Sequence, residues 1–261
     1  MNRSAFGYLL MRFRFSLLVV LVLLLGTSTA QAEEYMDPSW PNLMRTMVRF
    51  NALDLSDAAL LDEYTIITEC NLYKAFYRDD FKWHQVHDAM LKSVQMNLPT
   101  FPTAYHYDVN LQFDRYDFNA GVYRLTEKTT LSNVNTFVFY SVTGTSCGTA
   151  DVKFMPRIFR AVLSAPFYLD GLPLSQTDAQ ALLKQMESDK NTDHIVYARF
   201  NLRVVYIEPL RKEKKADQDI MTHYVQSDSL GAGIVRFDVR LESVNFYEDP
   251  ENTKLIYQFQ P

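Results

Sequence analysis

The main change in the spacing of apolar residues along this chain falls near Ala104, and this change constrains the fold more than any other feature. Before it, apolar residues recur with the 3.6-residue period of an α-helix, and after it they alternate with polar residues as in a β-strand. In residues 104–114, for example, Tyr, Val, Leu and Phe alternate with His, Asp, Asn and Gln. Helices first and strands afterwards predict an α+β protein with N-terminal helices packed on a mainly antiparallel sheet.

Capping residues, prolines and glycines set the expected bounds of these elements. Ser56 is expected to cap the second helix, and Ser175 with Asp178 resembles a capping box. We expect helices over 42–50, 57–77 and 81–96, and one between strands over 176–187. We expect strands over 104–114, 122–125, 135–142, 151–155, 159–163, 194–207, 235–241 and 255–259. The charged segment 211–219 is expected to be a loop.

Residues 1–32 have the features of a cleavable secretory signal. The first 14 residues hold three arginines and no acid, and the apolar run 15–25 follows. Ala30 and Ala32 then occupy the −3 and −1 positions of an A-x-A site, so cleavage is predicted before Glu33. The helical part would then cover 33–98 and the mainly β part 99–261, and the two can form one compact domain.

The alternative to cleavage is an uncleaved transmembrane anchor. Eleven apolar residues make a helix of about 16 Å, which is short against a hydrocarbon core of about 30 Å. Met11 is an alternative start that leaves a compact basic region before the apolar run. We therefore expect a periplasmic or secreted protein with no stable membrane insertion after cleavage.

The net negative charge of the predicted mature chain argues against two classes of partner, nucleic acids and anionic lipid surfaces. Removing the signal takes away three arginines and no acid, which leaves 23 basic against 31 acidic residues. Nucleic-acid binding depends on Lys and Arg that neutralise phosphates, so a net acidic chain without a basic patch argues against it. The same sign disfavours adsorption to anionic lipid headgroups.

Two cysteines, Cys70 and Cys147, lie in the predicted mature chain. In an oxidising compartment such an isolated pair is more often a disulfide than two free thiols. The bridge would close a loop of about 77 residues, worth about 4–5 kcal/mol on the chain-entropy model. The alternative is two unpaired buried thiols. No C-x-x-C is present, so a thioredoxin-like role and a thiolate zinc site are unsupported.

Four stretches of the sequence carry a resemblance to a known group of proteins. They are ECNLYKAFYRDDFKWHQVHDAM (69–90), FPT (101–103), FDRYDF (113–118) and DGLPLSQTDAQALLKQM (170–186). Together they resemble an uncharacterised family of exported bacterial proteins that is grouped only as a domain of unknown function. The resemblance implies export and a bacterial origin, and it implies no activity.

The segment Gly144–Gly148 matches the G-x-S-x-G pattern, in which a tight turn presents a nucleophilic Ser146. The order Ser, Asp, His would be completed by Asp170, Asp178 or Asp193 with His194 or His223. Against this interpretation, the residues that follow Gly148 read as a strand where a hydrolase needs a helix. The alternating strand–helix pattern of a doubly wound sheet is also missing, so a structural loop is the competing interpretation.

Two histidines and a carboxylate form a second candidate site, with His84, His87 and Asp88 on one predicted helix. Two His at i and i+3 can share a metal ion, but zinc normally needs a third and a fourth ligand. The competing interpretation is a polar helix flank beside the apolar stripe of Trp83. The sequence predicts no cofactor.

Two repeated patterns could serve binding. Tyr105, Tyr107, Tyr116 and Tyr123 could form a stacking platform for sugars, although their period-2 placement predicts core positions. The scheme Arg, aromatic, Asp/Asn, apolar recurs at 115–118, 199–202 and 236–239. On neighbouring strands it could build a surface ladder of Arg and acid groups for a partner, or form ordinary solvated strand faces.

These observations favour a non-catalytic exported protein that binds an unidentified protein or takes part in a cell-envelope assembly. The alternative is a small serine hydrolase that uses Ser146.

Overall fold

The structure is a computed structural model, and it describes residues 34–129, 131, 134–142, 152–188, 193–214, 222–225 and 233–261. The chain divides into two compact units, Met1–Glu33 and Glu34–Pro261. The fold described below is that of the second unit. Over the described residues, none of the helices combines the length and the apolar character that crossing a membrane requires.

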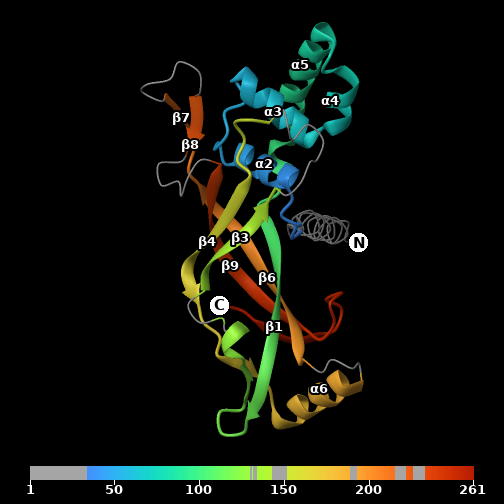
Figure 1. Ribbon diagram of the computed structural model, residues 1–261, viewed down its shortest axis with the longest axis vertical. Coiled ribbons are helices and arrows are strands. Elements are labelled where there is room, and N and C mark those ends of the chain that lie inside the picture. The colour runs from blue at the N-terminus through green and yellow to red at the C-terminus, as the bar shows by residue number, and fades with distance from the viewer. Residues whose placement is uncertain are drawn as a thin grey trace, which may run out of the picture. The chain divides into compact units, whose positions relative to one another are not determined.

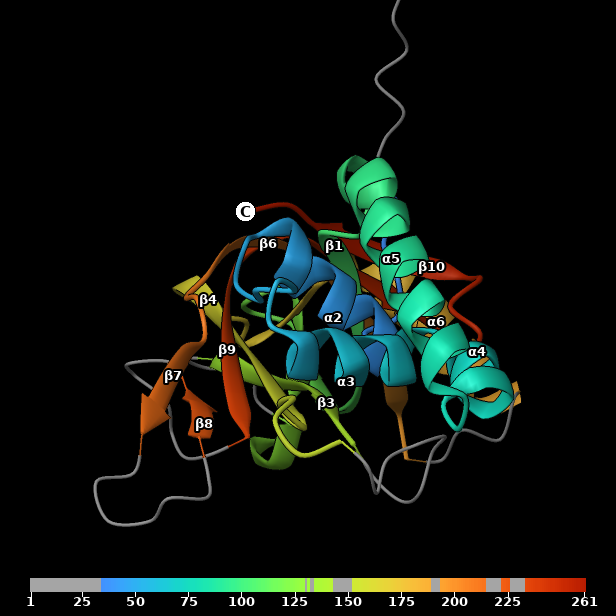
Figure 2. The ribbon, with the colours of Figure 1, turned by 90° about the horizontal axis from the view of Figure 1, so that it is seen from above.

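Four helices precede the first strand, and they lie over the ends of the strands (Figures 1 and 2). Ser39 caps the first of them by accepting a hydrogen bond from the backbone N–H of Asn42, and Pro41 occupies its first turn. The helices are α2 Trp40–Arg49, α3 Ala58–Thr68, α4 Cys70–Phe76 and α5 Asp80–Asn97.

The single helix expected over 57–77 is wrong, because the chain breaks at Glu69 into α3 and α4. The two halves differ in burial: α3 is buried nearly all round, whereas α4 buries no residue. Glu69 itself has φ −134° and ψ 58°, which lies outside the helical region and ends α3. The cap also differs from the expectation, because the side chain of Asp57, and not that of Ser56, accepts the N–H of Ala59.

The rest of the unit is built from strands and one further helix. The strands of the main sheet are β1 Ala104–Asp117, β2 Val122–Leu125, β3 Val134–Ser141, β4 Ile158–Phe167, β5 Gly171–Pro173, β6 Ile195–Ile207, β9 Ile234–Tyr247 and β10 Leu255–Phe259. A separate two-stranded sheet pairs β7 Arg211–Lys214 with β8 Thr222–Val225. Helix α6 covers Gln176–Ser188, and two short 3-10 turns cover Leu98–Thr100 and Glu127–Thr129.

The α+β class is confirmed, but the sheet is mixed. Its order is β3-β4-β9-β6-β1-β2-β5, with β10 also paired to β9. All its pairs are antiparallel except β4 with β9, which run parallel from Ile158↔Ile234 to Leu163↔Val239. Parallel neighbours need a long crossover, and the chain between β4 and β9 supplies one.

The main sheet curls, and its core is aromatic. β3 stands first in the strand order and β1 fifth, yet the rings of Phe137 and Tyr107 lie 5.0 Å apart. Phe139 and Tyr105 contact each other in the same way at 5.6 Å, and Phe137 also lies 5.1 Å from Phe200 on β6. The aromatic contacts across the curled sheet therefore close its interior.

A buried carboxylate ties the helices to the chain that leads into β4. Glu63 on α3 is 4% exposed, and it accepts the backbone N–H groups of Lys153, Phe154 and Met155 at 2.6–3.0 Å. Burial raises the pKa of Glu63, and these hydrogen bonds act in the opposite direction. The strand expected over 151–155 is absent from residues 152–155, because this carboxylate binds the donors that a sheet would use.

The loop expected over 211–219 is also corrected, because its first four residues form β7. Residues 215–219 lie outside the described part of the chain.

Candidate functional site

One edge of β9 is covered by two different strands that do not meet. β6 pairs with β9 along one edge from Phe237 to Tyr247. β4 covers the opposite edge up to Val239, and β10 covers it from Val244 onward. Among the described strands, none pairs with residues 240–243 on that edge. The main sheet is therefore forked there.

Local chemistry ends the pairing of β4 with β9. The hydroxyl of Ser164 donates a hydrogen bond to the backbone oxygen of Val239 at 3.1 Å. This backbone acceptor of β9 is therefore bonded to a side chain of β4. Pro166 then lacks the N–H that a strand needs to continue the ladder. On β9, the register against β6 slips between the pairs Asn201↔Ser243 and Leu202↔Leu241, so Glu242 is an extra residue in the ladder, which is a β-bulge.

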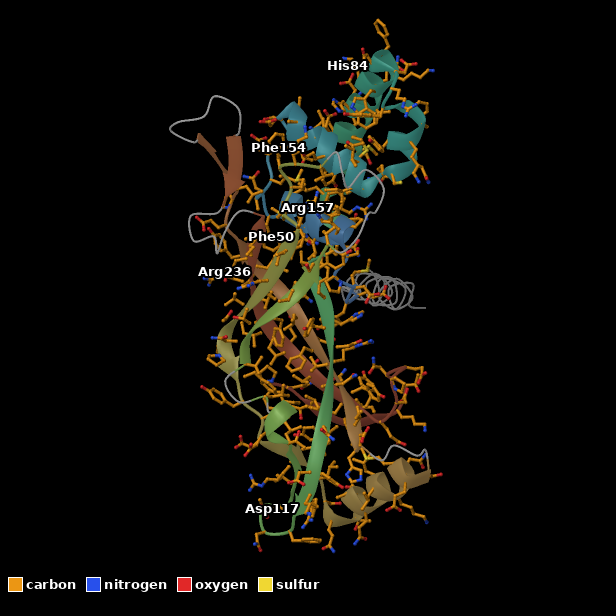
Figure 3. The ribbon with its side chains drawn as sticks, in the orientation of Figure 1. Phe50, His84, Asp117, Phe154, Arg157 and Arg236 are labelled. Carbon is orange, nitrogen blue, oxygen red and sulfur yellow. The ribbon has the colours of Figure 1, made fainter. Side chains whose placement is uncertain are left out.

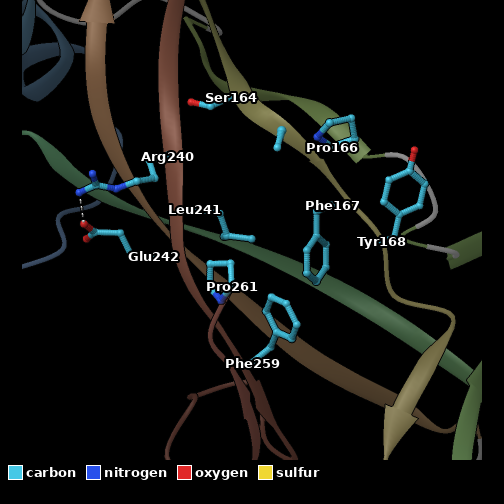
Figure 4. Close-up of a pocket in the computed structure, with 10 residues that line it drawn as sticks. Ser164, Pro166, Phe167, Tyr168, Arg240, Leu241, Glu242, Phe259 and Pro261 are labelled. Carbon is cyan, nitrogen blue, oxygen red and sulfur yellow. Dashed lines mark hydrogen bonds and ion pairs between the residues drawn. The ribbon is translucent and has the colours of Figure 1, made fainter.

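The fork opens into a groove of about 730 Å³ (Figure 4). The rings of Phe167 and Phe259 meet edge to face at its floor, with centroids 5.2 Å apart. Leu241 lines the β9 side, and the exposed Tyr168 stands at the rim. Most of the lining is apolar, which suits an apolar side chain of a bound molecule.

An ion-pair cluster fixes the β9 side of the groove. The carboxylate of Glu242 accepts hydrogen bonds from Nε of Arg203 (2.7 Å), from a guanidinium nitrogen of Arg240 (3.0 Å) and from the hydroxyl of Tyr35 (2.7 Å). Burial acts to raise the pKa of Glu242, but these hydrogen bonds outweigh it and lower the pKa to about 2. Burial and Glu242 together raise the pKa of Tyr35 to about 12.

The structure does not bring Asp193 and His223 together. Asp193 is exposed just before β6 begins, whereas His223 lies on β8, opposite Glu213 and beyond the other end of β6. A strand of 13 residues spans about 40 Å. The short chain from Ile207 to Glu213 can return along the strand by at most about 20 Å, so His223 stays far from Asp193. Ser146 lies outside the described residues.

The three metal candidates on α5 also do not converge. His84 and Asp88 are exposed, and Figure 3 shows His84 at the far end of the helical part. His87 instead places Nε2 2.5 Å from Oδ1 of Asp62 on α3, which also accepts the indole N–H of Trp83 at 2.6 Å. In the described part of the chain, no three His, Cys, Asp or Glu side chains are grouped to hold a metal ion.

The four tyrosines of the expected platform separate into two pairs. Tyr105 and Tyr107 pack inside the curled sheet against Phe139 and Phe137. Tyr116 and Tyr123 lie together at the opposite end of β1, with ring centroids 6.0 Å apart. No single surface carries all four.

Parts of the expected Arg–acid ladder are present on the strands. Arg199 on β6 makes a bidentate ion pair with Asp108, directly opposite on β1, at 2.7 and 2.8 Å. Arg236 pairs with Asp238 along β9 at 2.7 Å. Cys70 begins α4, and Cys147 lies outside the described residues, so their pairing stays a prediction.

Sequence reasoning missed the groove, because strand pairing between distant segments creates it. One signal was available: Pro166 follows an apolar run of strand character, and proline marks the end of regular pairing. The residues that line the groove otherwise read as ordinary strand positions.

Comparison with known proteins gives one match. The model of a family described as a domain of unknown function (DUF4852) matches residues 57–185, from the cap of α3 into α6. No curated protein matches the chain, and no solved structure does. Over residues 57–185 this chain is thus similar to the uncharacterised DUF4852 family.

Proposed function

We propose that this protein is a non-catalytic exported protein of the cell envelope, and that it binds an extended segment of a partner protein at the groove beside β9. The observation that carries the proposal is the uncovered stretch 240–243 on one edge of a long strand. Natural sheets protect such edges, and partners add strands to edges left open.

The neighbouring surface supplies the other requirements of strand addition. Backbone groups of β9 would give hydrogen bonds, and an apolar side chain of the partner would enter beside Phe167, Leu241 and Phe259. Arg203 and Arg240 hold Glu242 in place, so the rim is ordered before binding. Preorganisation of this kind lowers the entropy cost of association.

Photo-crosslinking tests the binding surface. Benzoylphenylalanine replaces Tyr168 at the groove or, as the matched control, Phe81 on α5, because both positions are exposed aromatics. We expect a discrete protein adduct from position 168 only, and Ala165→Lys in the groove should abolish it. Ala120→Lys, in an exposed turn, should leave it unchanged. Adducts from both positions, or adducts insensitive to Ala165→Lys, would contradict the proposal.

Export and cleavage are part of the same proposal. The compact unit begins at Glu34, one residue after the predicted first residue of the mature chain. Met36 is already bound to β1, because its N–H donates to the oxygen of Ala104 and its own oxygen accepts the N–H of His106. Cell fractionation with intact-mass analysis should find a periplasmic or secreted chain that begins at Glu33 or within a few residues. A chain that keeps residues 15–25 and sediments with membranes would overturn this part.

The predicted bridge between Cys70 and Cys147 has indirect support. Glu63 is bonded to the backbone of Lys153 at 2.6 Å. Cys70 follows Glu63 closely in the sequence, and Cys147 closely precedes Lys153. Each of these two short stretches of chain spans at most about 25 Å. Both thiols therefore belong to segments that are held together at one point.

A fluorophosphonate probe tests the hydrolase alternative. Binding without catalysis predicts no labelling of the native protein. Labelling that disappears in Ser146→Ala would show a reactive serine and would overturn the non-catalytic proposal.

A further inference from the structure

A second cavity, of about 330 Å³, lies between α6 and the adjoining ends of β1 and β2. It shares no lining residue with the groove beside β9. Its volume lies at the lower end of the range of small-molecule sites. An apolar cavity on the order of 150 Å³ is enough to hold benzene. This cavity therefore has room for a molecule of one or two rings.

One wall of the cavity is a face of α6. Gln176, Ala179, Gln180 and Leu183 line it, at the i, i+3, i+4 and i+7 spacing that places side chains on one side of a helix. Ala179 is 4% exposed and stands where a longer side chain would enter the cavity. Because Ala179, Leu182 and Met186 of α6 are buried, packing holds this wall in position.

The opposite wall is aromatic. Tyr116 lies 5.1 Å from Phe118 and 6.0 Å from Tyr123, measured between ring centroids, and both pairs meet edge to face. The hydroxyl of Tyr116 donates to the backbone oxygen of Leu174 at 2.8 Å, which fixes the central ring. Phe118 is 72% exposed, so a large apolar ring is held at the mouth of the cavity. Such rings gain contact area when a flat apolar molecule enters.

The polar groups at the cavity restrict the chemistry of its occupant. Asp114 and Arg115 have opposite charges, and His194 and the two glutamines complete the polar part of a mainly apolar lining. A charged ligand would find no excess of opposite charge there. A sugar would place several hydroxyl groups against a surface that is mostly apolar, which costs hydration. An uncharged aromatic molecule with one polar atom matches the lining best.

His194 reaches the cavity through an unusual backbone conformation. Its φ is 50°, in the left-handed region that non-glycine residues rarely adopt, and its backbone oxygen accepts the N–H of Phe113 at 3.1 Å. Residues held in this way concentrate at binding sites. We propose that this cavity is a binding site for a small, uncharged aromatic molecule of one or two rings.

Indole is the probe for the test, because it has two rings and one hydrogen-bond donor. Titration of the labelled mature protein, followed by NMR, should give saturable shifts at Ala179 and His194 with a dissociation constant of about 1 mM or below. Ala179→Met fills the cavity and should weaken binding at least tenfold. The same exchange at Ala165, in the groove beside β9, should leave binding unchanged.

A second variant keeps the test decisive if Ala179→Met does not fold. Phe118→Ala removes an exposed ring and should leave the fold intact while it weakens indole binding about threefold to tenfold. Absence of saturable shifts in the native protein would overturn the proposal, as would binding unaffected by Phe118→Ala. Saturable shifts of the same residues with N-acetylglucosamine, and none with indole, would overturn the proposed ligand class.

Discussion

Replacement of Glu63 by alanine removes the contact that joins α3 to the chain entering β4. Its two carboxylate oxygens accept four hydrogen bonds from the backbone N–H groups of Lys153, Phe154 and Met155. In Glu63→Ala these donors lose their acceptor, and the methyl group leaves a space where the carboxylate was. The exchange is neutral or favourable for the helix itself, because alanine has the highest helix propensity.

The magnitude follows from the number and the burial of the donors. A hydrogen bond to a charged group contributes about 1.5–3 kcal/mol, and removing one partner of a buried charged contact costs about 3–5 kcal/mol. Water can reach part of this site, because Lys153 is exposed, which keeps the estimate below the sum of the bonds. We expect Glu63→Ala to lower the free energy of unfolding by about 3–5 kcal/mol.

Urea unfolding followed by circular dichroism measures this loss. The comparison requires that the slope of the unfolding free energy against urea concentration is the same in the native protein and the variant. Glu187→Ala is the matched control, because it makes the same exchange at an exposed position of α6 and should change stability by less than about 0.5 kcal/mol. A loss below about 1 kcal/mol for Glu63→Ala would refute the role of the carboxylate as the anchor of this segment.

Three further predictions concern other contacts of the fold. Alkylation without reductant should leave Cys70 and Cys147 unlabelled, and reduction should lower the melting temperature; labelling of both native thiols would contradict the bridge. Because the folded pKa of Glu242 is about 2 against an ordinary 4.5, its contribution to stability is present above about pH 4.5 and is lost as the pH falls towards 2. The stability difference between the native protein and Glu242→Gln should therefore shrink over this range, and a constant difference in acid unfolding experiments would contradict the assignment. His87→Ala should cost about 1 kcal/mol in urea unfolding and His84→Ala less than about 0.5, and equal losses would contradict the contact of His87 with Asp62.

Local signals predicted the elements whose ends depend on nearby residues. The turn before β2 contains Gly121, whose φ of 67° favours glycine, and the strand begins where expected. Ser175 accepts the N–H of Asp178 at 3.1 Å and donates to its carboxylate, so the start of α6 was also readable. Such signals act within a few residues and leave a pattern in the sequence.

Features that depend on distant partners were not predictable in this way. The segment 152–155 alternates like a strand, but Glu63, about 90 residues earlier, binds its donors instead. The groove beside β9 exists because β4 and β10 end at different points of the same edge, which no single strand reveals. His87 likewise reads as a metal ligand until Asp62 of another helix is placed beside it.

The strand order has a consequence for how the chain can be divided. β6 and β9 stand in the middle of the sheet, and both lie beyond residue 185, where the family match ends. A fragment restricted to 57–185 would keep β3–β4 and β1–β2–β5 as two ribbons that share no strand pairing, and the edges of β4 and β1 that pair with β9 and β6 would be open. The matched stretch is therefore a unit of sequence similarity and not a unit of cooperative folding. Fragments made for expression need to extend to the end of β10, because the last strands along the chain join the first ones.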